Sequence, residues 1–331
     1  MSRSSRAART GGLALCLALV AGACSTNAPA ATTTSGTAPA YPATVVNCSN
    51  EVTFDAAPER VVVFRNEVIP VLSSLGVLDR VVGLVGQFHE EYFDAGTNRE
   101  LAEIPVLSGE ISQVGGGEIS LEEVLAQDPD LVIGTSETVT RDALLAQGIT
   151  VLENEESCEG SRATSTLADI DTLFRLYADV FDRQDEADTA LAEVDAQVQE
   201  AVDRIEPDGE RTAAMLYPTL GGGPAYTYGS GSMNHTLLEL AGLTNVFGDV
   251  PDRTYEVSVE DLLARDPDVL ILLHSGAAPA EVEEAVTALP GAEGLTAVRD
   301  GDLVPLLFGF TSPASPITVE GLDLIVESTQ G

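Results

Sequence analysis

Lysine is absent from this chain of 331 residues, so its 16 basic residues are all arginine, against 53 aspartates and glutamates. The formal net charge is therefore -37 at pH 7. Such an acidic chain is excluded as a nucleic-acid-binding protein, because affinity for phosphates depends on basic residues that displace counterions. The charge suits a solvated, secreted protein, including one that works in high salt, where self-repulsion is screened.

The signature motifs of common enzymes are also missing. The sequence has no Gly-x-Ser-x-Gly nucleophile elbow, no phosphate loop with lysine, no dinucleotide fingerprint and no Cys-x-x-Cys pair. The run Gly115-Gly116-Gly117 lacks a basic partner and predicts a flexible loop. We therefore expect no enzymatic activity. A metal-dependent hydrolase built on the three histidines, His89, His235 and His274, is the remaining enzyme alternative.

No apolar run is long enough to cross a membrane comfortably. The longest candidate, residues 11–22, follows the basic residues Arg3, Arg6 and Arg9. A positive start followed by a short apolar run is typical of a secretory signal peptide, here residues 1–23. Its removal takes away three arginines and no acid, so the net charge becomes 13 - 53 = -40.

Cys24 directly follows small residues at the end of this segment, as in a lipobox, and would be the lipidated first residue of the mature chain. Ala21 departs from the Leu or Val that is usual three positions earlier, and an ordinary secreted protein cut nearby is the alternative. Residues 24–45 are rich in Ala, Thr, Ser and Pro without periodicity, which predicts a flexible tether.

Two cysteines remain after Cys16 is lost with the signal and Cys24 is lipidated, namely Cys48 and Cys158. An oxidising compartment favours a disulfide between them, which would tie the start of the first lobe to its last loop. Two free buried thiols are the alternative, because spacing alone does not prove pairing.

One helix-strand pattern occurs twice. Residues 120–134, SLEEVLAQDPDLVIG, resemble residues 258–272, SVEDLLARDPDVLIL. Each copy has a Ser N-cap with an acid three residues later, a helix-stopping Asp-Pro-Asp and an apolar run of strand length. The repeat predicts an α/β fold of two Rossmann-like lobes with parallel sheets.

The helical spacing of residues 166–205 predicts a short helix and then a long one of about twenty residues, the single long backbone helix that joins the lobes. The predicted first lobe is 46–165, the connecting helices are 166–206, and the second lobe is 207–331.

Ligands of parallel sheets bind at the carboxyl ends of the strands. In the first lobe, the runs 61–64, 81–85, 105–107, 131–133 and 149–152 predict strands. In the second lobe, we expect strands at 212–217, 269–273 and 303–307 and helices near 236–241 and 281–289. The residues after the first two strands, Arg65 and His89 among them, are thus candidates for a ligand cleft.

Several phrases of the sequence resemble the helical-backbone (class III) substrate-binding lipoproteins of ABC importers for ferric siderophores, vitamin B12 and haem. The pair Asn47-Cys48 with a later Cys158 is similar to a branch of high-GC Gram-positive bacteria in which these two cysteines pair. The other phrases cover most of residues 46–306 and are VNCSNEVTFDAAPERVVVF, LSSLGVLDRVVGL, IPVLSG, SLEEVLAQDPDLVIG, LLELAGLTNVFG and LTAVRDGDLVPL.

This resemblance implies contacts with the permease through one carboxylate on each lobe. The usual positions are occupied here by Pro70 and Thr236. Glu67 and Glu239, each about one helical turn away, are the substitute candidates. Ordinary solvated acids are the alternative for both.

The resemblance also implies that cleft residues of both lobes contact the ligand. Arg65 is placed to pair with an anionic group, with a local salt bridge as the alternative. The three histidines are cleft candidates, but no pair shows a recognised metal spacing, so no metal site is assigned. Aromatic residues of the second lobe complete the predicted set, with core packing as their alternative. They are Tyr217, Tyr228 (with Tyr226, a possible iron ligand beside His235), Tyr255 and Phe310.

Taken with the anchor, the resemblance predicts a monomeric, lipid-anchored protein on the extracellular face of the membrane that captures an iron chelate and delivers it to ABC permease subunits. No cofactor is expected. Cobalamin, haem or a metal ion bound directly by histidine are the alternative ligands, and the absence of tryptophan weighs against cobalamin, whose flat corrin favours large aromatic walls.

Overall fold

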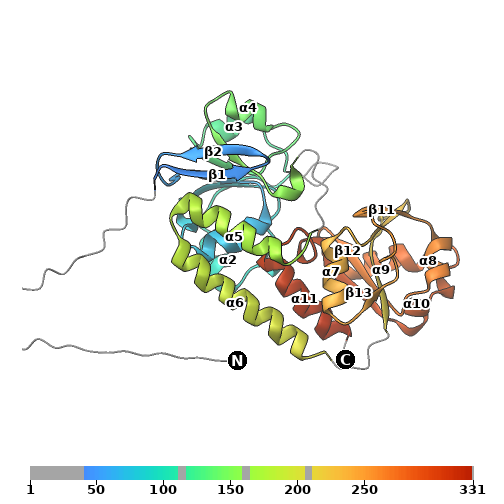
Figure 1. Ribbon diagram of the computed structural model, residues 1–331. Helices are drawn as coiled ribbons and strands as arrows, with labels where there is room; N and C mark the ends of the chain where they lie inside the picture. Colours follow the sequence, from blue (N-terminus) through green and yellow to red (C-terminus); the bar gives the residue numbers. More distant parts are fainter. Residues whose placement is uncertain (1–40, 111–116, 159–164, 206–210, 330–331) are drawn as a thin grey trace, which may run out of the picture. The chain divides into compact units, whose positions relative to one another are not determined.

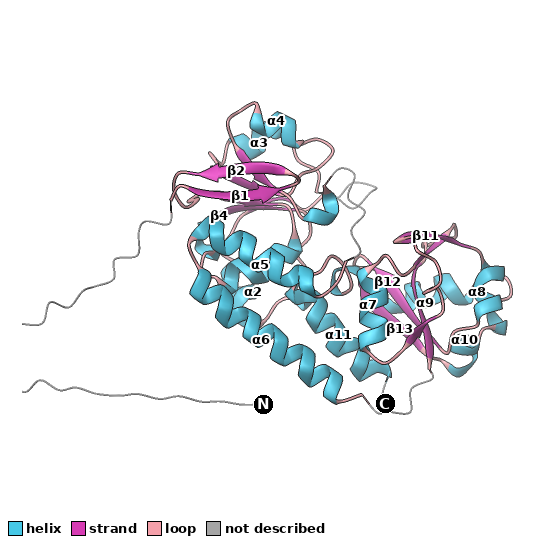
Figure 2. Cartoon of the chain, viewed as in Figure 1, coloured by secondary structure: helices cyan, strands magenta, loops and turns pink. Residues whose placement is uncertain are grey.

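The computed structural model describes residues 41–110, 117–158, 165–205 and 211–329. The predicted signal peptide, Cys24 and most of the tether lie outside the described residues. Two β-sheets, each covered by helices, form two lobes, as the α/β prediction required (Figure 1, Figure 2). Among the described helices, none is long and apolar enough to cross a membrane.

The first lobe has an all-parallel sheet in the order β5-β4-β3-β6-β7. Its central strand β3 is buried completely, as its all-valine sequence predicts for a strand covered on both faces. The strands are β3 (Val61–Val63), β4 (Val81–Val85), β5 (Val106–Ser108), β6 (Leu131–Ile133) and β7 (Thr150–Leu152). The helices that link these strands along the chain are short. They are α1 (Ile69–Ser74), α2 (Ala95–Leu101), α3 (Leu121–Leu125) and α4 (Arg141–Leu145).

A hairpin of β1 (Ala43–Asn47) and β2 (Asn50–Phe54) precedes this sheet. It turns at Cys48 and Ser49, whose φ angles of 49° and 62° match the positive values that a two-residue hairpin turn needs. Tyr41 donates a hydrogen bond to the carbonyl of Val180. The predicted tether therefore extends too far at residue 45, since Tyr41 already contacts α5 (Ala168–Phe181) and strand β1 begins at Ala43.

Helices α5 (Ala168–Phe181) and α6 (Gln184–Asp203) connect the lobes. Asp182, which has a left-handed conformation, ends α5 and separates the two. The twenty-residue α6 spans roughly 30 Å. A short helix followed by a long one is the arrangement that the spacing of apolar residues predicts.

The second lobe has a mixed sheet in the order β11-β9-β8-β12-β13, with β10 also paired to β8. Strands β8, β10, β12 and β13 are parallel, whereas β9 and β11 pair antiparallel. The predicted parallel pairing is confirmed for β8, β12 and β13, and the strands β9 and β11, which were not predicted, make the sheet mixed at this edge. The strands are β8 (Thr212–Tyr217), β9 (Ala225–Tyr228), β10 (Thr244–Asn245), β11 (Thr254–Val257), β12 (Val269–His274) and β13 (Leu303–Leu307). The helices are α7 (Met233–Leu240), α8 (Val259–Arg265), α9 (Pro279–Thr287), α10 (Thr296–Asp300) and α11 (Pro316–Thr329).

The two sequence repeats occupy corresponding places in the two lobes. Ser120 caps α3 in a complete capping box with Glu123, and the helix leads to β6. Ser258 caps α8 by accepting from the amide of Asp261, and that helix leads to β12. Each of these strands has a parallel neighbour on both sides, so the repeated unit supplies an interior strand of each lobe.

The last helix, α11, was not predicted. It packs against α6 and α1 as well as against α7 of the second lobe, so it strengthens the connection between the lobes (Figure 1). Gly321 permits the close approach of α11 to the 3₁₀ helix η6 (Phe308–Phe310), because a Cβ there would lie 1.8 Å from the carbonyl oxygen of Phe310. One apolar core accordingly includes residues of the first lobe, the connecting helices and the second lobe.

Candidate ligand-binding site

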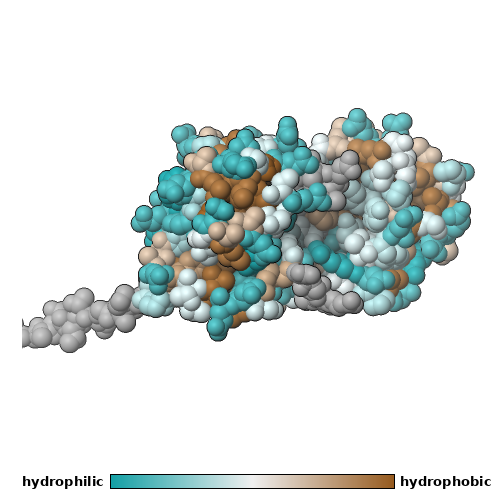
Figure 3. Space-filling model, turned by 90° about the horizontal axis from the view of Figure 1, so that it is seen from above, coloured by the Kyte–Doolittle hydropathy of each residue, from teal (hydrophilic) through white to brown (hydrophobic). Residues whose placement is uncertain are grey.

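A cavity of about 280 Å³ is lined by residues of both lobes. Most of them follow the carboxyl ends of strands β3, β4, β12 and β13, where parallel sheets bind ligands. The hollowed surface between the lobes can be followed in Figure 3. The polar and charged residues of its wall are Arg65, Asn66, Glu67, Gln87, His89, Glu156, Ser157, Arg253, Ser275 and Ser312. The aromatic residues are Phe64, Tyr92 and Phe308.

Arg65 lies two residues after the end of β3, in extended conformation. Gly134, after the neighbouring β6, makes room for it, since a Cβ there would lie 2.7 Å from Cγ of Arg65. The guanidinium donates one long hydrogen bond of 3.5 Å to the carbonyl of Thr135, and its Nε is buried without a partner. Among the described residues no carboxylate forms an ion pair with Arg65, so its charge is available to a ligand.

Glu67 lies on the 3₁₀ helix η1 (Asn66–Val68) and faces the same cavity. Burial raises the pKa of its carboxyl, Arg65 opposes this rise, and Glu156 adds to it. The side chain is only partly exposed and lies in the cavity wall, and its predicted permease contact stays a prediction. The first turn after β3 is bent back into the cleft, which the helical spacing of the sequence does not reveal.

An ion pair crosses the cleft. Arg253, in the loop before β11, bonds to Glu156, on the 3₁₀ helix η4 (Glu155–Ser157) of the first lobe. Arg253 also donates to the hydroxyl of Ser312 at 3.1 Å, and Ser165 donates to the other oxygen of Glu156. Because the side chain of Arg253 remains 46% exposed, this guanidinium keeps donors free beside its ion pair.

Aromatic residues close the base of the cleft. The hydroxyl of Tyr92, from the first lobe, accepts a hydrogen bond of 3.0 Å from the amide of Gly309 in the second. Burial raises the pKa of Tyr92 to about 12, so the phenol stays neutral. Its ring packs edge-on against Phe310, with centroids 5.0 Å apart. Gly309 has no room for a side chain, since a Cβ would lie 2.6 Å from Cζ of Tyr92.

Two histidines from opposite lobes approach one another at the rim. His89 lines the cavity, and a Cβ at Gly276 would lie 2.9 Å from its Cε1. Burial and the positive charge of His89 lower the pKa of His274, and Glu91 partly offsets them. Within the described part of the chain, no group of three or more His, Cys, Asp or Glu side chains could hold a metal ion.

The eight predicted ligand residues divide into four groups. Arg65 and His89 lie in the cavity wall. Tyr217 and His274 line a neighbouring pocket, and the hydroxyl of Tyr217 lies 2.9 Å from that of Ser275 in the cavity wall. Phe310 is buried behind Tyr92 and supports it.

The remaining three predicted ligand residues, Tyr228, His235 and Tyr255, lie outside the cavity wall. Tyr228 is buried at the end of the antiparallel strand β9, toward the β11 edge of the sheet, and is near enough to Arg253 for that charge to oppose the rise that burial causes in the pKa of the phenol. Tyr255 pairs with Thr227 near that edge and packs against Phe247, and His235 contacts Asn245 at 3.4 Å. Their predicted ligand contacts stay predictions, and the strands β9 and β11 that position the two tyrosines were not predicted.

Glu239 is exposed on α7 and its carboxylate accepts a long bond of 3.5 Å from the amide of Asn245. Its predicted permease contact stays a prediction. Sequence reasoning missed Arg253, Glu156, Tyr92 and Phe308. Only Glu156 had a feature in the sequence that could have identified it, since it lies two residues before Cys158, which forms the disulfide with Cys48.

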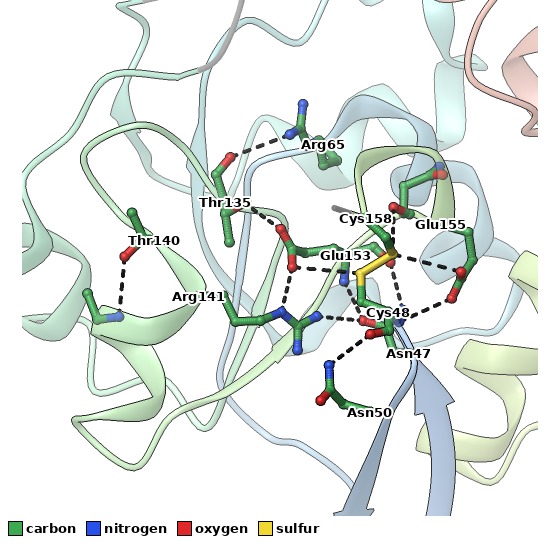
Figure 4. A network of polar contacts seen from close by, with 12 residues as sticks. Asn47, Cys48, Asn50, Arg65, Thr135, Thr140, Arg141, Glu153, Glu155 and Cys158 are labelled. Carbon is green, nitrogen blue, oxygen red and sulfur yellow. Dashed lines mark hydrogen bonds and ion pairs between the residues drawn. A yellow bond between two sulfur atoms is a disulfide. The ribbon is translucent and has the colours of Figure 1, made fainter. Parts of the chain in front are cut away.

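A polar network braces the first-lobe wall (Figure 4). Cys48 and Cys158 are joined by a disulfide. Beside it, the side chain of buried Asn47 donates to the carbonyl of Glu153 at 2.7 Å, and its oxygen accepts from the amide of Glu153 and from Arg141, each at 2.9 Å.

The same network reaches the cavity. The carboxylate of Glu153 pairs with Arg141 at 2.6 Å and accepts a hydrogen bond of 2.6 Å from the hydroxyl of Thr135. Since Arg65 donates to the carbonyl of Thr135, the hairpin turn and the cavity arginine belong to one set of contacts.

Comparisons with known proteins agree with this architecture. A family model described as periplasmic binding protein matches residues 61–306. A solved structure of an ABC-type Fe³⁺-hydroxamate transport system from Saccharomonospora viridis is 44% identical, with a TM-score of 0.79, covering 88% of this chain and 100% of that one. A vitamin B12-binding protein from Pectobacterium carotovorum is 25% identical over 218 residues, 63% of this chain and 75% of that protein. The periplasmic haem-binding protein RhuT from Roseiflexus sp. RS-1, at 19% identity and a TM-score of 0.64, covers 82% of this chain and 99% of its own length and shares the fold.

Proposed function

We propose that this chain, which belongs to the periplasmic binding protein family, captures a ferric chelate of the hydroxamate type in the cavity between its lobes. It is a substrate-binding protein, and delivery of the chelate to an ABC permease is part of the proposal. The relative of 44% identity, which covers nearly the whole chain, supports the hydroxamate class of ligand.

The observation that carries this proposal is the pair of arginines, Arg65 and Arg253, that line one cavity from opposite lobes. Guanidinium groups donate hydrogen bonds to the electron-rich oxygens of hydroxamate and carboxylate groups. A ligand that bridges both arginines also contacts both lobes, so its binding favours the arrangement in which the two lobes lie close together around the ligand. Phe64, Tyr92 and Phe308 supply apolar surface for the organic part of the chelate.

The cellular setting is a further part of the proposal. Lipidation at Cys24 would hold the binding unit at the outer face of the membrane, with the following residues up to about residue 40 as the tether. The exposed Glu239 on α7 is the candidate carboxylate for permease contact in the second lobe. In the first lobe the candidate is Glu67, which lies in the cavity wall.

Cobalamin is the second candidate ligand, on the basis of the B12-binding relative. A bare metal ion is disfavoured by the donor set, since the histidines His89 and His274 have no third ligating side chain among the described residues.

A thermal-shift screen tests the proposal. The purified protein is heated with ferric hydroxamates, other ferric siderophores, ferric citrate, haem, cobalamin, and zinc, manganese and iron salts. A ligand that binds only the native state stabilises it by mass action, by about 2.7 kcal/mol at a ligand concentration of a hundred times the Kd. This stabilisation raises the melting temperature. We expect a shift with ferric hydroxamates. A shift with cobalamin, haem or a bare metal alone would contradict the proposed ligand class.

A further inference from the structure

The carboxyl group of Glu67 is unusual among the acids of this chain. Most of the acidic side chains face solvent or pair with arginine, whereas Glu67 lies in the cavity wall close to a second acid, Glu156. Among the described residues, its oxygens have no ion pair and no hydrogen bond to another residue. Arg65, two residues earlier, is near enough to oppose the rise of its pKa but forms no ion pair with it.

An acid in this position has two possible roles. As a carboxylate it would only accept hydrogen bonds, and its charge would repel the oxygens of a chelate bound to Arg65. As a neutral acid it has one O–H to donate, and it then adds a donor to those of the neighbouring guanidinium. Burial is the largest influence and favours the neutral form, and Glu156 adds to it; together they outweigh Arg65 and the hydrogen bond from the residue's own backbone, so the pKa of Glu67 is raised.

We infer that Glu67 serves in its protonated form as a hydrogen-bond donor of the ligand site, which makes the site specific for chelates that present oxygen acceptors, and makes their binding tighter at lower pH. This inference rests on the proposed function. It adds to that function by stating which ligand groups the cavity wall at Glu67 selects, namely oxygen acceptors. It also predicts that a chelate with an ammonium group directed at Glu67 is disfavoured.

Titratable side chains of neighbouring elements also face Glu67. Tyr177, from α5, lies below it, and burial together with the charge of Glu67 raises the pKa of this phenol, which therefore stays neutral throughout the physiological range. Glu156 is paired with Arg253. His89, also in the cavity wall, is present in both the wild-type chain and a Glu67 variant, so its contribution to a pH effect cancels in a comparison of the two.

The test is calorimetric titration with a neutral ferric trihydroxamate between about pH 5 and pH 8, on three proteins. They are the wild type, E67Q, and the control E260Q, which changes an exposed acid of α8 outside the cavity. Glutamine has the size of glutamate, keeps a donor and does not ionise. We expect the affinity of the wild type and of E260Q to fall by about tenfold or more as pH rises, since one lost donor facing a new charge costs about 1.4 kcal/mol or more. E67Q should retain its low-pH affinity.

Three results would overturn the inference. Parallel pH profiles of E67Q and the wild type would mean that Glu67 does not act through its proton. Affinity that rises with pH and is lost in E67Q would mean that the carboxylate binds a cationic group. Absence of binding by the wild type at any pH would refute the proposed function, and the specificity assigned to Glu67 with it.

A readout without ligand keeps the two claims separate. A protonated carboxyl and a carboxylate absorb at different infrared frequencies, so difference spectra across the same pH range follow the acid directly. We expect a carboxyl signal that is lost with rising pH in the wild type and in E260Q and is missing in E67Q. Identical difference spectra for E67Q and the wild type would overturn the inference even if the chelate binds.

Discussion

Replacing Asn47 by alanine tests whether the hairpin turn braces the first lobe. Asn47 is fully buried and makes three hydrogen bonds, two with the backbone of Glu153 and one with Arg141. A typical hydrogen bond contributes about 1 kcal/mol net and one to a charged group about 1.5–3 kcal/mol. Since alanine removes all three and leaves buried partners unpaired, we expect N47A to lower the free energy of unfolding by about 3 kcal/mol.

The assay is equilibrium unfolding in guanidinium chloride, with the slope of the transition checked for constancy. The matched control is N50A on the same hairpin, because exposed Asn50 donates a single bond of 2.8 Å to the carbonyl of Cys48. We expect N50A to cost about 0.5 kcal/mol or less, as surface changes usually do. Equal effects of the two substitutions would refute the reasoning, because the buried bonds of Asn47 would then contribute nothing beyond an exposed one.

Three further changes test other parts of the structure. Reduction of the disulfide between Cys48 and Cys158, which are 110 residues apart, should lower the free energy of unfolding by about 3 kcal/mol or more; two reactive thiols in the native protein, or melting curves that reductant does not change, would mean that no disulfide forms. G321A should destabilise by about 2 kcal/mol despite alanine's higher helix propensity, because the methyl group would clash with the backbone of Phe310; a rise in melting temperature would contradict the packing of α11. R253A should lower the stability of the unliganded protein by about 1 kcal/mol, since Arg253 is 46% exposed and its partner Glu156, only 14% exposed, keeps its hydrogen bond from Ser165, yet should weaken chelate binding by about tenfold or more; unchanged affinity would remove this arginine from the site.

The sequence was most informative where a local pattern determines structure. Strands β8 (Thr212–Tyr217) and β13 (Leu303–Leu307) have the predicted bounds, because continuous apolar runs between turn signals identify buried parallel strands. The Ser120 and Ser258 caps were predicted for the same reason, since a cap depends on residues only three positions apart.

Features that depend on long-range packing were not predictable in this way. Strand β9 pairs antiparallel with both β8 and β11, and nothing in these short sequences predicts the direction of the strand. Because neither strand was predicted, the sequence did not show that Tyr228 and Tyr255 lie outside the cavity wall. The inward position of Glu67 depends on how one turn after β3 packs against the second lobe. Arg253 likewise reaches the cavity only through the fold, since its loop precedes an edge strand.

The central claim is that a ferric chelate binds between the lobes through Arg65. Calorimetric titration of the purified protein with a ferric trihydroxamate tests it most directly, on the wild type, on R65Q, and on R99Q, which changes an exposed arginine of α2 outside the cavity. We expect one chelate to bind per chain and R99Q to bind it with unchanged affinity. The affinity of R65Q should be reduced by about tenfold or more, because a charge-assisted hydrogen bond contributes about 1.5–3 kcal/mol. Absence of binding by the wild type, or equal affinities of R65Q and R99Q, would contradict the claim.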